Sequence, residues 1–185
     1  MRCMERLFRR AGLPLAMSQG FHPKPQMTFP LALAVGIEGY DEVMELELTE
    51  SPQADALLVR LQSQAPVGLR FLSAEELAPG VRKARAVSAS YQVEVLPSRR
   101  AALEDRIQRL MAAATHPIRR PNRSASIDLR ASLVELALRA GVLEMRLRTD
   151  AGGSAGPRDV LAALELEDLE REGVALSRTV VEIAS

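Results

Sequence analysis

Aromatic residues, cysteine and histidine are scarce in this chain. Aromatic side chains make up 3% of its 185 residues, tryptophan is absent, and there are one cysteine, Cys3, and two histidines. One cysteine excludes an internal disulfide, and it excludes any zinc or iron–sulfur site that needs several cysteines of this chain. We therefore expect no metal site and no resident cofactor.

A net charge and long apolar runs are also absent. Lys plus Arg equals Asp plus Glu at 24 each, which excludes a global electrostatic attraction to nucleic acid or to a membrane surface. No apolar stretch approaches the roughly 18 residues of a spanning helix, and no signal-peptide pattern opens the chain. The sequence predicts a cytoplasmic protein with no membrane partner.

The balanced total conceals blocks of one sign. Residues 1–25 and 82–123 are mainly basic, whereas every charge in residues 38–55 is acidic and residues 159–172 are mainly acidic. Two interpretations are possible. Basic and acidic blocks pair with each other within the protein, or each block is a local charged surface that binds another molecule although the net charge is zero. The sequence leaves both interpretations open.

The most unusual stretch is Ser18 to Pro25, which reads S-Q-G-F-H-P-K-P. Pro23 and Pro25 fix their own φ angles, lack backbone donors, and push the residues before them toward extended geometry. We therefore predict a stiff loop that presents an imidazole and an ammonium at defined positions, which is a common way to build a site. The candidate ligand-binding residues are Ser18, Gln19, Phe21, His22 and Lys24.

Three roles are open for His22. An imidazole exchanges protons near neutral pH, so His22 could act as a general acid or base while Lys24 stabilises a developing anion. It could also contact a ligand without chemistry, or have a structural role with its ring bonded to nearby backbone. The sequence offers no evident carboxylate partner for a catalytic histidine.

Two further segments could bind anions. Arg119, Arg120 and Arg123 lie in a basic loop that could hold phosphates, although no aromatic residue is interleaved to stack on bases. Residues 152–156 are rich in glycine and precede a predicted helix, but they lack the lysine and the spacing of known phosphate-binding loops. In both cases the alternative is a solvated loop.

The first half of the chain predicts helix, strand, strand, helix, strand. Apolar residues recur at helical spacing over residues 1–11, and Gly12 suits the position after a helix end. Residues 26–34 are apolar and extended, and residues 43–49 alternate as a strand does. A helix capped by Ser51 runs to about residue 64, and residues 68–73 predict a returning strand.

The second half predicts strand, helix, strand, strand, helix, strand. The strands are expected where apolar and polar residues alternate, and the helices are expected after Ser98 as N-cap and after Pro157. The predicted strands are residues 89–95, 126–130, 133–139, 142–149 and 178–183.

This order is that of the split βαβ of the ferredoxin-like fold. We predict an α+β protein of two tandem ferredoxin-like (βαββαβ-type) modules with antiparallel sheets, the first of which lacks its opening strand. The predicted boundaries are 1–78 for the first module, 79–87 for a connector and 88–185 for the second module.

The segment from Leu7 to Glu38 also resembles the signature of a radical-SAM-linked family of bacterial proteins. Its most specific part is Gly20-Phe21-His22-Pro23, and S-I-D-L-R at 126–130, L-E-M-R-L-R at 143–148, G-P-R-D-V-L at 156–161 and S-R-T at 177–179 are similar too. The resemblance implies a radical SAM protein as partner. Because this chain has one cysteine, the partner must hold the iron–sulfur cluster.

The resemblance has one departure, at the start. Family members look to begin with a strand and a His- and Asp-containing turn that this sequence lacks. We expect either that the natural chain starts further upstream or that this is a shortened copy. In the second case the loss of the turn could leave the copy without activity.

We predict a binding or substrate-presenting module for a radical SAM protein, an RNA, or both. An alternative is a metal-independent RNA-cleaving enzyme that uses His22, and a third is a purely structural partner subunit. Cleavage of RNA in EDTA would single out the nuclease, and salt-sensitive RNA binding would exclude the structural subunit.

Overall fold

The computed structural model describes residues 2–78, 80–119, 126–149 and 154–184. The chain divides into two compact units, and each has its own hydrophobic core. Unit 1 consists of Met1–Phe29 and Met44–Lys83, and unit 2 of Pro30–Val43 and Ala84–Ala184. Within the described residues, no helix is both long and apolar enough to cross a bilayer.

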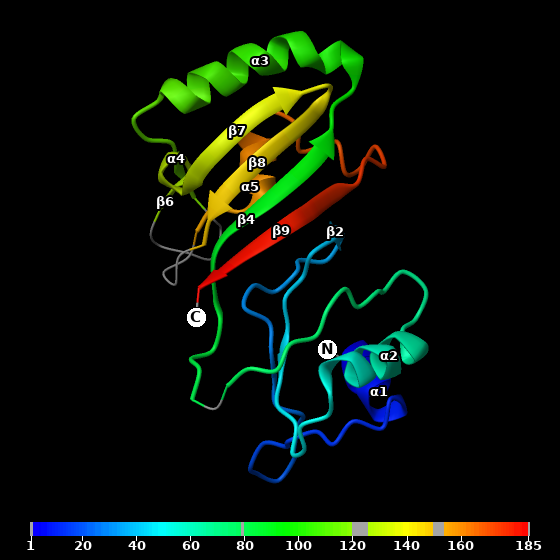
Figure 1. Cartoon of the computed structure of the whole chain (residues 1–185). Coiled ribbons are helices and arrows are strands. Elements are labelled where there is room, and N and C mark those ends of the chain that lie inside the picture. The colour runs from blue at the N-terminus through cyan, green and yellow to red at the C-terminus, as the bar shows by residue number, and fades with distance from the viewer. Residues whose placement is uncertain (1, 79, 120–125, 150–153, 185) are drawn as a thin grey trace. The chain divides into compact units, whose positions relative to one another are not determined.

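Unit 1 is built from two helices and a two-stranded sheet (Figure 1). The helices are α1 (Arg2–Arg10) and α2 (Ala54–Gln64), and strand β1 (Met27–Thr28) pairs antiparallel with β3 (Glu45–Leu46). The apolar stripe of α1 packs into the core, where Leu7 and Phe8 are fully buried. The amphipathic opening helix that the sequence predicts is therefore confirmed.

The end of α1 is fixed by its glycine. Gly12 has φ +62°, a left-handed conformation in which other residues are strained, and this lets the chain turn out of the helix. The Leu13 N–H then donates to the Phe8 carbonyl at 3.1 Å, and the Gly12 N–H donates to the Arg9 carbonyl at 3.1 Å. These two bonds form a Schellman motif, as Gly12 at this position predicts.

Three predictions for unit 1 are wrong in detail. No strand forms at residues 68–73; the Phe71 N–H donates instead to the Gln62 side chain, 3.0 Å away, and Phe71 packs on the core. The extended segments 26–34 and 43–49 contribute only two strand residues each. Helix α2 begins at Ala54, its N-cap residue is Gln53 and not Ser51, and the Ser51 hydroxyl donates to the Glu76 carboxylate.

Unit 2 is a five-stranded sheet with the order β2-β9-β4-β8-β7 (Figure 1). The strands are β2 (Ile37–Gly39), β4 (Arg85–Glu94), β7 (Leu133–Arg139), β8 (Val142–Arg148) and β9 (Leu176–Ala184). All neighbours pair antiparallel except β2 and β9, which are parallel. A separate two-stranded sheet joins β5 (Pro117–Ile118) to β6 (Ile127–Asp128).

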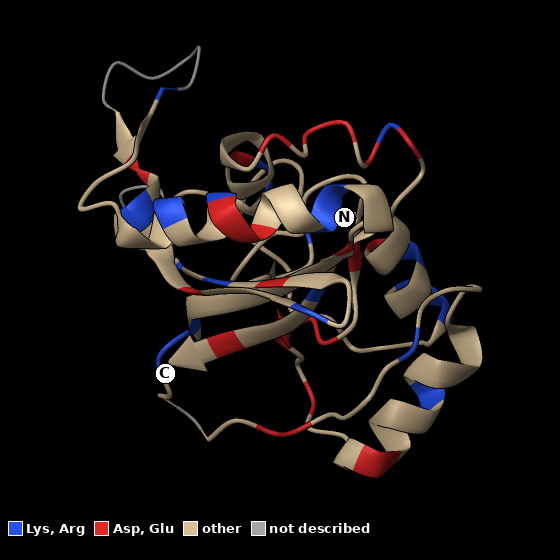
Figure 2. Cartoon of the chain, turned by 90° about the horizontal axis from the view of Figure 1, so that it is seen from above, with Lys and Arg blue, Asp and Glu red and all other residues tan. Residues whose placement is uncertain are grey.

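Helices α3 (Pro97–Ala112) and α5 (Pro157–Ala163) lie on the same face of this sheet (Figure 2). Leu103 and Ile107 of α3 and Val160 of α5 share one core cluster with Tyr91 and Met145 of the strands. The chain after α5 adds to this layer through three fully buried leucines, Leu164, Leu166 and Leu169. The face below the helices therefore holds the core of unit 2.

The α+β class and the strand–helix–strand–strand–helix–strand series of residues 85–184 agree with the sequence. Two assignments within it need correction. Helix α3 begins at Pro97, so Ser98 lies inside the helix and does not cap it. Segment 126–130 is not one strand, because Asp128 accepts the Arg130 N–H and starts the short helix α4 (Leu129–Ser132).

Candidate functional site

The Ser18–Lys24 segment, which we call the His22 loop, is the tip of a small hairpin in unit 1. Met17 and Pro25 form an antiparallel bridge at its base. The Ser18 N–H donates to the Lys24 carbonyl at 2.8 Å, and the Lys24 N–H donates to the Ser18 hydroxyl at 3.0 Å. The two ends of the loop are thus held together. Pro23 within the loop and Pro25 just after it restrict the φ angles of the backbone.

Below the bridge, the loop is attached to the two-stranded sheet. The Gln26 N–H donates to the Ala16 carbonyl at 2.8 Å, and the Ala16 N–H donates to the Glu47 carbonyl at 2.9 Å. The Glu47 N–H in turn donates to the Gln26 carbonyl at 3.0 Å. These backbone bonds fix the loop to β1 and β3 without using any side chain of the loop itself.

The side chains at the tip extend into solvent. Phe21 is 102% exposed, so its ring contacts almost nothing else in the protein. Ser18, Gln19, His22 and Lys24 are exposed as well. Five residues proposed from the sequence as ligand contacts are therefore brought together on one loop, all of them accessible.

The His22 imidazole has no hydrogen bond or ion pair to any residue that the structure describes. Nor do the described residues contain a group of three or more His, Cys, Asp or Glu side chains that could hold a metal ion. A catalytic histidine is normally oriented by a second group. The exposed geometry of His22 suits contact with another molecule better than chemistry by this chain alone.

The second proposed site lies largely outside the described residues. Arg119 is exposed just after β5, and Arg120 and Arg123 fall outside the described part of the chain. At the start of α5, the Gly156 N–H donates to the Asp159 carboxylate at 2.7 Å. A carboxylate thus occupies the position where residues 152–156 had been considered as an anion site.

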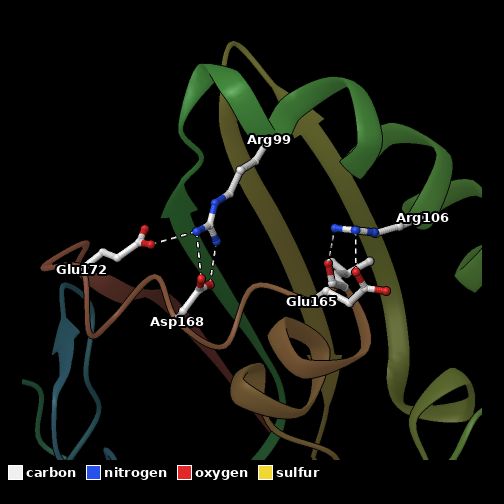
Figure 3. A network of polar contacts seen from close by, with 6 residues as sticks. Arg99, Arg106, Glu165, Asp168 and Glu172 are labelled. Carbon is white, nitrogen blue, oxygen red and sulfur yellow. Dashed lines mark hydrogen bonds and ion pairs between the residues drawn. The ribbon is translucent and has the colours of Figure 1, made fainter.

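The structure also shows a network of ion pairs that the sequence did not predict (Figure 3). Arg99 of α3 donates to both carboxylate oxygens of Asp168, at 2.6 and 2.8 Å, and to Glu172 at 2.8 Å. About two turns along the same helix, Arg106 contacts Glu165 and donates to the Leu164 carbonyl at 3.1 Å. The network ties α3 to the segment that follows α5.

These contacts change the ionisation of the groups involved. The hydrogen bond from Arg99 lowers the pKa of Asp168 below its usual value, against the opposing effect of desolvation. The same hydrogen bond, which Asp168 accepts, raises the pKa of Arg99. Since each charged group is matched by its neighbour, the network has a structural role and leaves no group poised for catalysis.

The sheet face away from α3 and α5 is polar. Ser88 donates to Glu182 and accepts from Arg146 at 3.2 Å, and Arg146 also pairs with Glu182, so that three neighbouring strands are linked. A hollow of about 220 Å³ beside this cluster is lined in part by Ser90 and Gln92. Both basic and acidic segments occur along the strands of the sheet (Figure 2).

Comparison with known proteins gives a family. A family model described as "Uncharacterized protein conserved in bacteria (DUF2344)" matches residues 1–157. No curated protein and no solved structure matches the chain. The chain belongs to this family of uncharacterized bacterial proteins.

Proposed function

We propose that this member of the bacterial family is a binding module that presents the His22 loop to a protein partner. The observation that carries the proposal is the loop itself: it is closed at its base, attached to the sheet by backbone bonds, and fully open at its tip. A loop held in one conformation loses little entropy on binding, which favours association. The resemblance of residues 7–38 to the radical-SAM-linked family suggests a radical SAM protein as that partner.

The architecture we propose for unit 2 is a ferredoxin-like module. The element series β4-α3-β7-β8-α5-β9 and the antiparallel order β9-β4-β8-β7 support it. Strand β2 is then an addition to this module from an earlier part of the chain. For unit 1, the tandem arrangement and the boundaries 1–78, 79–87 and 88–185 stay predictions.

Co-purification tests the proposed function. The tagged protein is expressed together with a candidate radical SAM protein from the same bacterium, and the dissociation constant of the purified pair is measured by calorimetry. We expect a one-to-one complex that His22→Ala or Lys24→Ala weakens while the circular dichroism spectrum is unchanged. Absence of a complex under these conditions would remove the radical SAM partner from the proposal.

RNA is the second candidate ligand. It is supported by the juxtaposition of an exposed aromatic ring at Phe21 and an ammonium at Lys24, since bases stack on aromatic rings and phosphates bind cations. Binding of labelled single-stranded RNA should then weaken steeply with salt, and further when Arg119 is changed to Ala. Cleavage of that RNA in EDTA, lost in His22→Ala, would instead select the metal-independent nuclease.

A further inference from the structure

We infer that Phe21 is the anchor of the proposed contact, and that its ring enters an apolar pocket of a partner protein whose rim carries carboxylates. The inference rests on the proposed function and adds to it the residue that supplies most of the binding energy and the chemistry of the surface that receives it.

The first argument is the exposure of Phe21 compared with the other phenylalanines. Phe8 is fully buried, and Phe29 and Phe71 are partly buried, whereas Phe21 is 102% exposed. Leaving such a side chain in water forgoes the favourable free energy that burial of its apolar surface would supply. In a chain with 3% aromatic residues, this ring is not buried by any residue described in its own unit.

The second argument is that the backbone carrying the ring is closed into a loop. Phe21 lies in the segment between Met17 and Pro25, which form an antiparallel bridge. The base is closed by the two hydrogen bonds between Ser18 and Lys24, and Pro23 limits the backbone between them. An anchor held in advance binds more tightly than one on a mobile segment, because less conformational freedom is lost.

The third argument is charge. Residues 11–37 contain no Asp or Glu, so Lys24, with His22 beside it, sets the sign of the loop. A positively charged loop around an apolar ring is complementary to a pocket with an apolar floor and an acidic rim. Aromatic anchors that fill such pockets are the residues at which binding energy concentrates in protein interfaces.

The shape of the loop favours a protein pocket over a nucleic acid strand. Proteins that bind single strands use a positively charged groove with several aromatic side chains along it. Here one ring lies at the tip of a hairpin, and the neighbouring loop residues Gln19 and Gly20 are exposed around it. One projecting ring fits a hole on a partner, and it offers no track for successive bases.

The test compares two equally exposed apolar side chains of unit 1. Val67 is 107% exposed and serves as the matched control for Phe21. With the purified radical SAM protein as the probe, we expect Phe21→Ala to weaken binding by about 30-fold or more, mainly through faster dissociation, whereas Val67→Ala stays within about twofold. Phe21→Leu should recover part of the affinity, and Lys24→Ala should reduce the salt dependence of association.

The outcomes separate the inference from the function on which it rests. If Phe21→Ala binds the probe as tightly as the wild type does, Phe21 is not the anchor, and the proposed function is unaffected. The same conclusion follows if Val67→Ala loses as much affinity as Phe21→Ala. Failure of the wild type to bind the probe overturns both. Single-stranded RNA that binds the wild type and is lost in Phe21→Ala, with no effect of that change on the protein complex, overturns the protein pocket. A loss of the helical circular dichroism signal in Phe21→Ala would identify a folding defect. In that case the affinity of Phe21→Leu for the probe tests the anchor role.

Discussion

At the scale of the residue, Arg178 is the most buried charged side chain among the described residues. Its side chain is 2% exposed and donates to Glu42 and to the carbonyls of Leu31 at 2.9 Å and Ala32 at 3.3 Å. Burial lowers the pKa of Arg178, but the hydrogen bonds and charges of Glu42 and Tyr91 together raise it by more. Arg178 therefore fixes Pro30–Val43 to the edge of the unit 2 sheet.

We predict that Arg178→Ala destabilises unit 2 by about 1.5–3 kcal/mol, because it removes the charged hydrogen bonds of a buried guanidinium to Glu42 and to the Leu31 carbonyl. The free energy of unfolding is measured in urea by circular dichroism. Arg148 of β8 is exposed, so Arg148→Ala is the control and should change stability by less than about 0.5 kcal/mol. Equal stability of the two variants would contradict the anchoring role.

The His22 loop belongs to the same scale. The prolines in the sequence predict a stiff loop at His22 and Lys24, because φ restriction acts within one residue, and both side chains are exposed in the structure. The prolines were not enough to predict the closure of the loop, since the bonds between Ser18 and Lys24 depend on how the loop returns to the sheet.

At the scale of the element, α1 and α2 cap each other. Arg60 of α2 donates to the Ala11 carbonyl at 2.8 and 3.1 Å and to the Gly12 carbonyl, just past the end of α1. In return, Arg10 at the end of α1 donates to the Gln64 carbonyl at 2.9 Å, at the end of α2. Cations at helix C-termini satisfy free carbonyls and oppose the helix dipole.

We predict that Arg60→Ala weakens unit 1 by about 1.5–3 kcal/mol, since it removes charged hydrogen bonds from a partly buried site. Hydrogen exchange followed by mass spectrometry should show faster exchange in α1 and unchanged exchange in β4 and β9. Arg70→Ala, an exposed change in the same unit, is the comparison and should leave α1 protected. Protection of α1 that survives Arg60→Ala would argue against mutual capping.

At the scale of the whole molecule, the charge blocks of the sequence are partly explained by internal pairs. Arg99 and Arg106, in the basic block 82–123, contact Asp168 and Glu165 in the acidic block 159–172 (Figure 3). Glu42, in the acidic block 38–55, pairs with Arg178. For these residues the intramolecular interpretation is confirmed.

Carboxylates that accept hydrogen bonds in unit 2 make its free energy of unfolding depend on pH in the acidic range. Hydrogen bonds from Arg99, Arg158 and Ser88 are the largest causes that lower the pKa of Asp168, Glu170 and Glu182, respectively. A carboxyl group whose pKa is lowered by folding stabilises the fold above its ordinary pKa, which is 3.8 for Asp and 4.5 for Glu. That stabilisation is lost as the pH falls through the lowered value.

We therefore predict a melting temperature that is nearly constant from about pH 7 to pH 5 and falls steeply between about pH 4.5 and pH 2. Asp168→Asn should lower the melting temperature at neutral pH and reduce the loss in acid, because the group that titrates is gone. Calorimetry on both proteins at matched ionic strength measures this. An identical acid slope in the variant would show that the Asp168 pair contributes nothing to it.

The sequence alone determined the local features of this protein. Alternation located β7 and β8 almost to the residue, helical spacing with Gly12 located α1 and its end, and two prolines identified the exposed His22 loop. Each depends on neighbours within a few positions, where side-chain period and backbone restriction act directly. Predictions that relied on local capping, such as Ser51 and Ser98, were wrong because packing set where those helices begin.

Only the tertiary structure decided which distant segments share a core. Leu69 and Phe71 have the composition of a strand but pack against the unit 1 core without a pairing partner, since strand formation needs a neighbour that composition does not specify. Ile37–Gly39 joins β9, 139 positions further along at Ile37↔Leu176, and the ion pair of Arg178 with Glu42 also links the two segments. Those two residues are in contact but far apart in the sequence, so no local sequence pattern predicts that they pair.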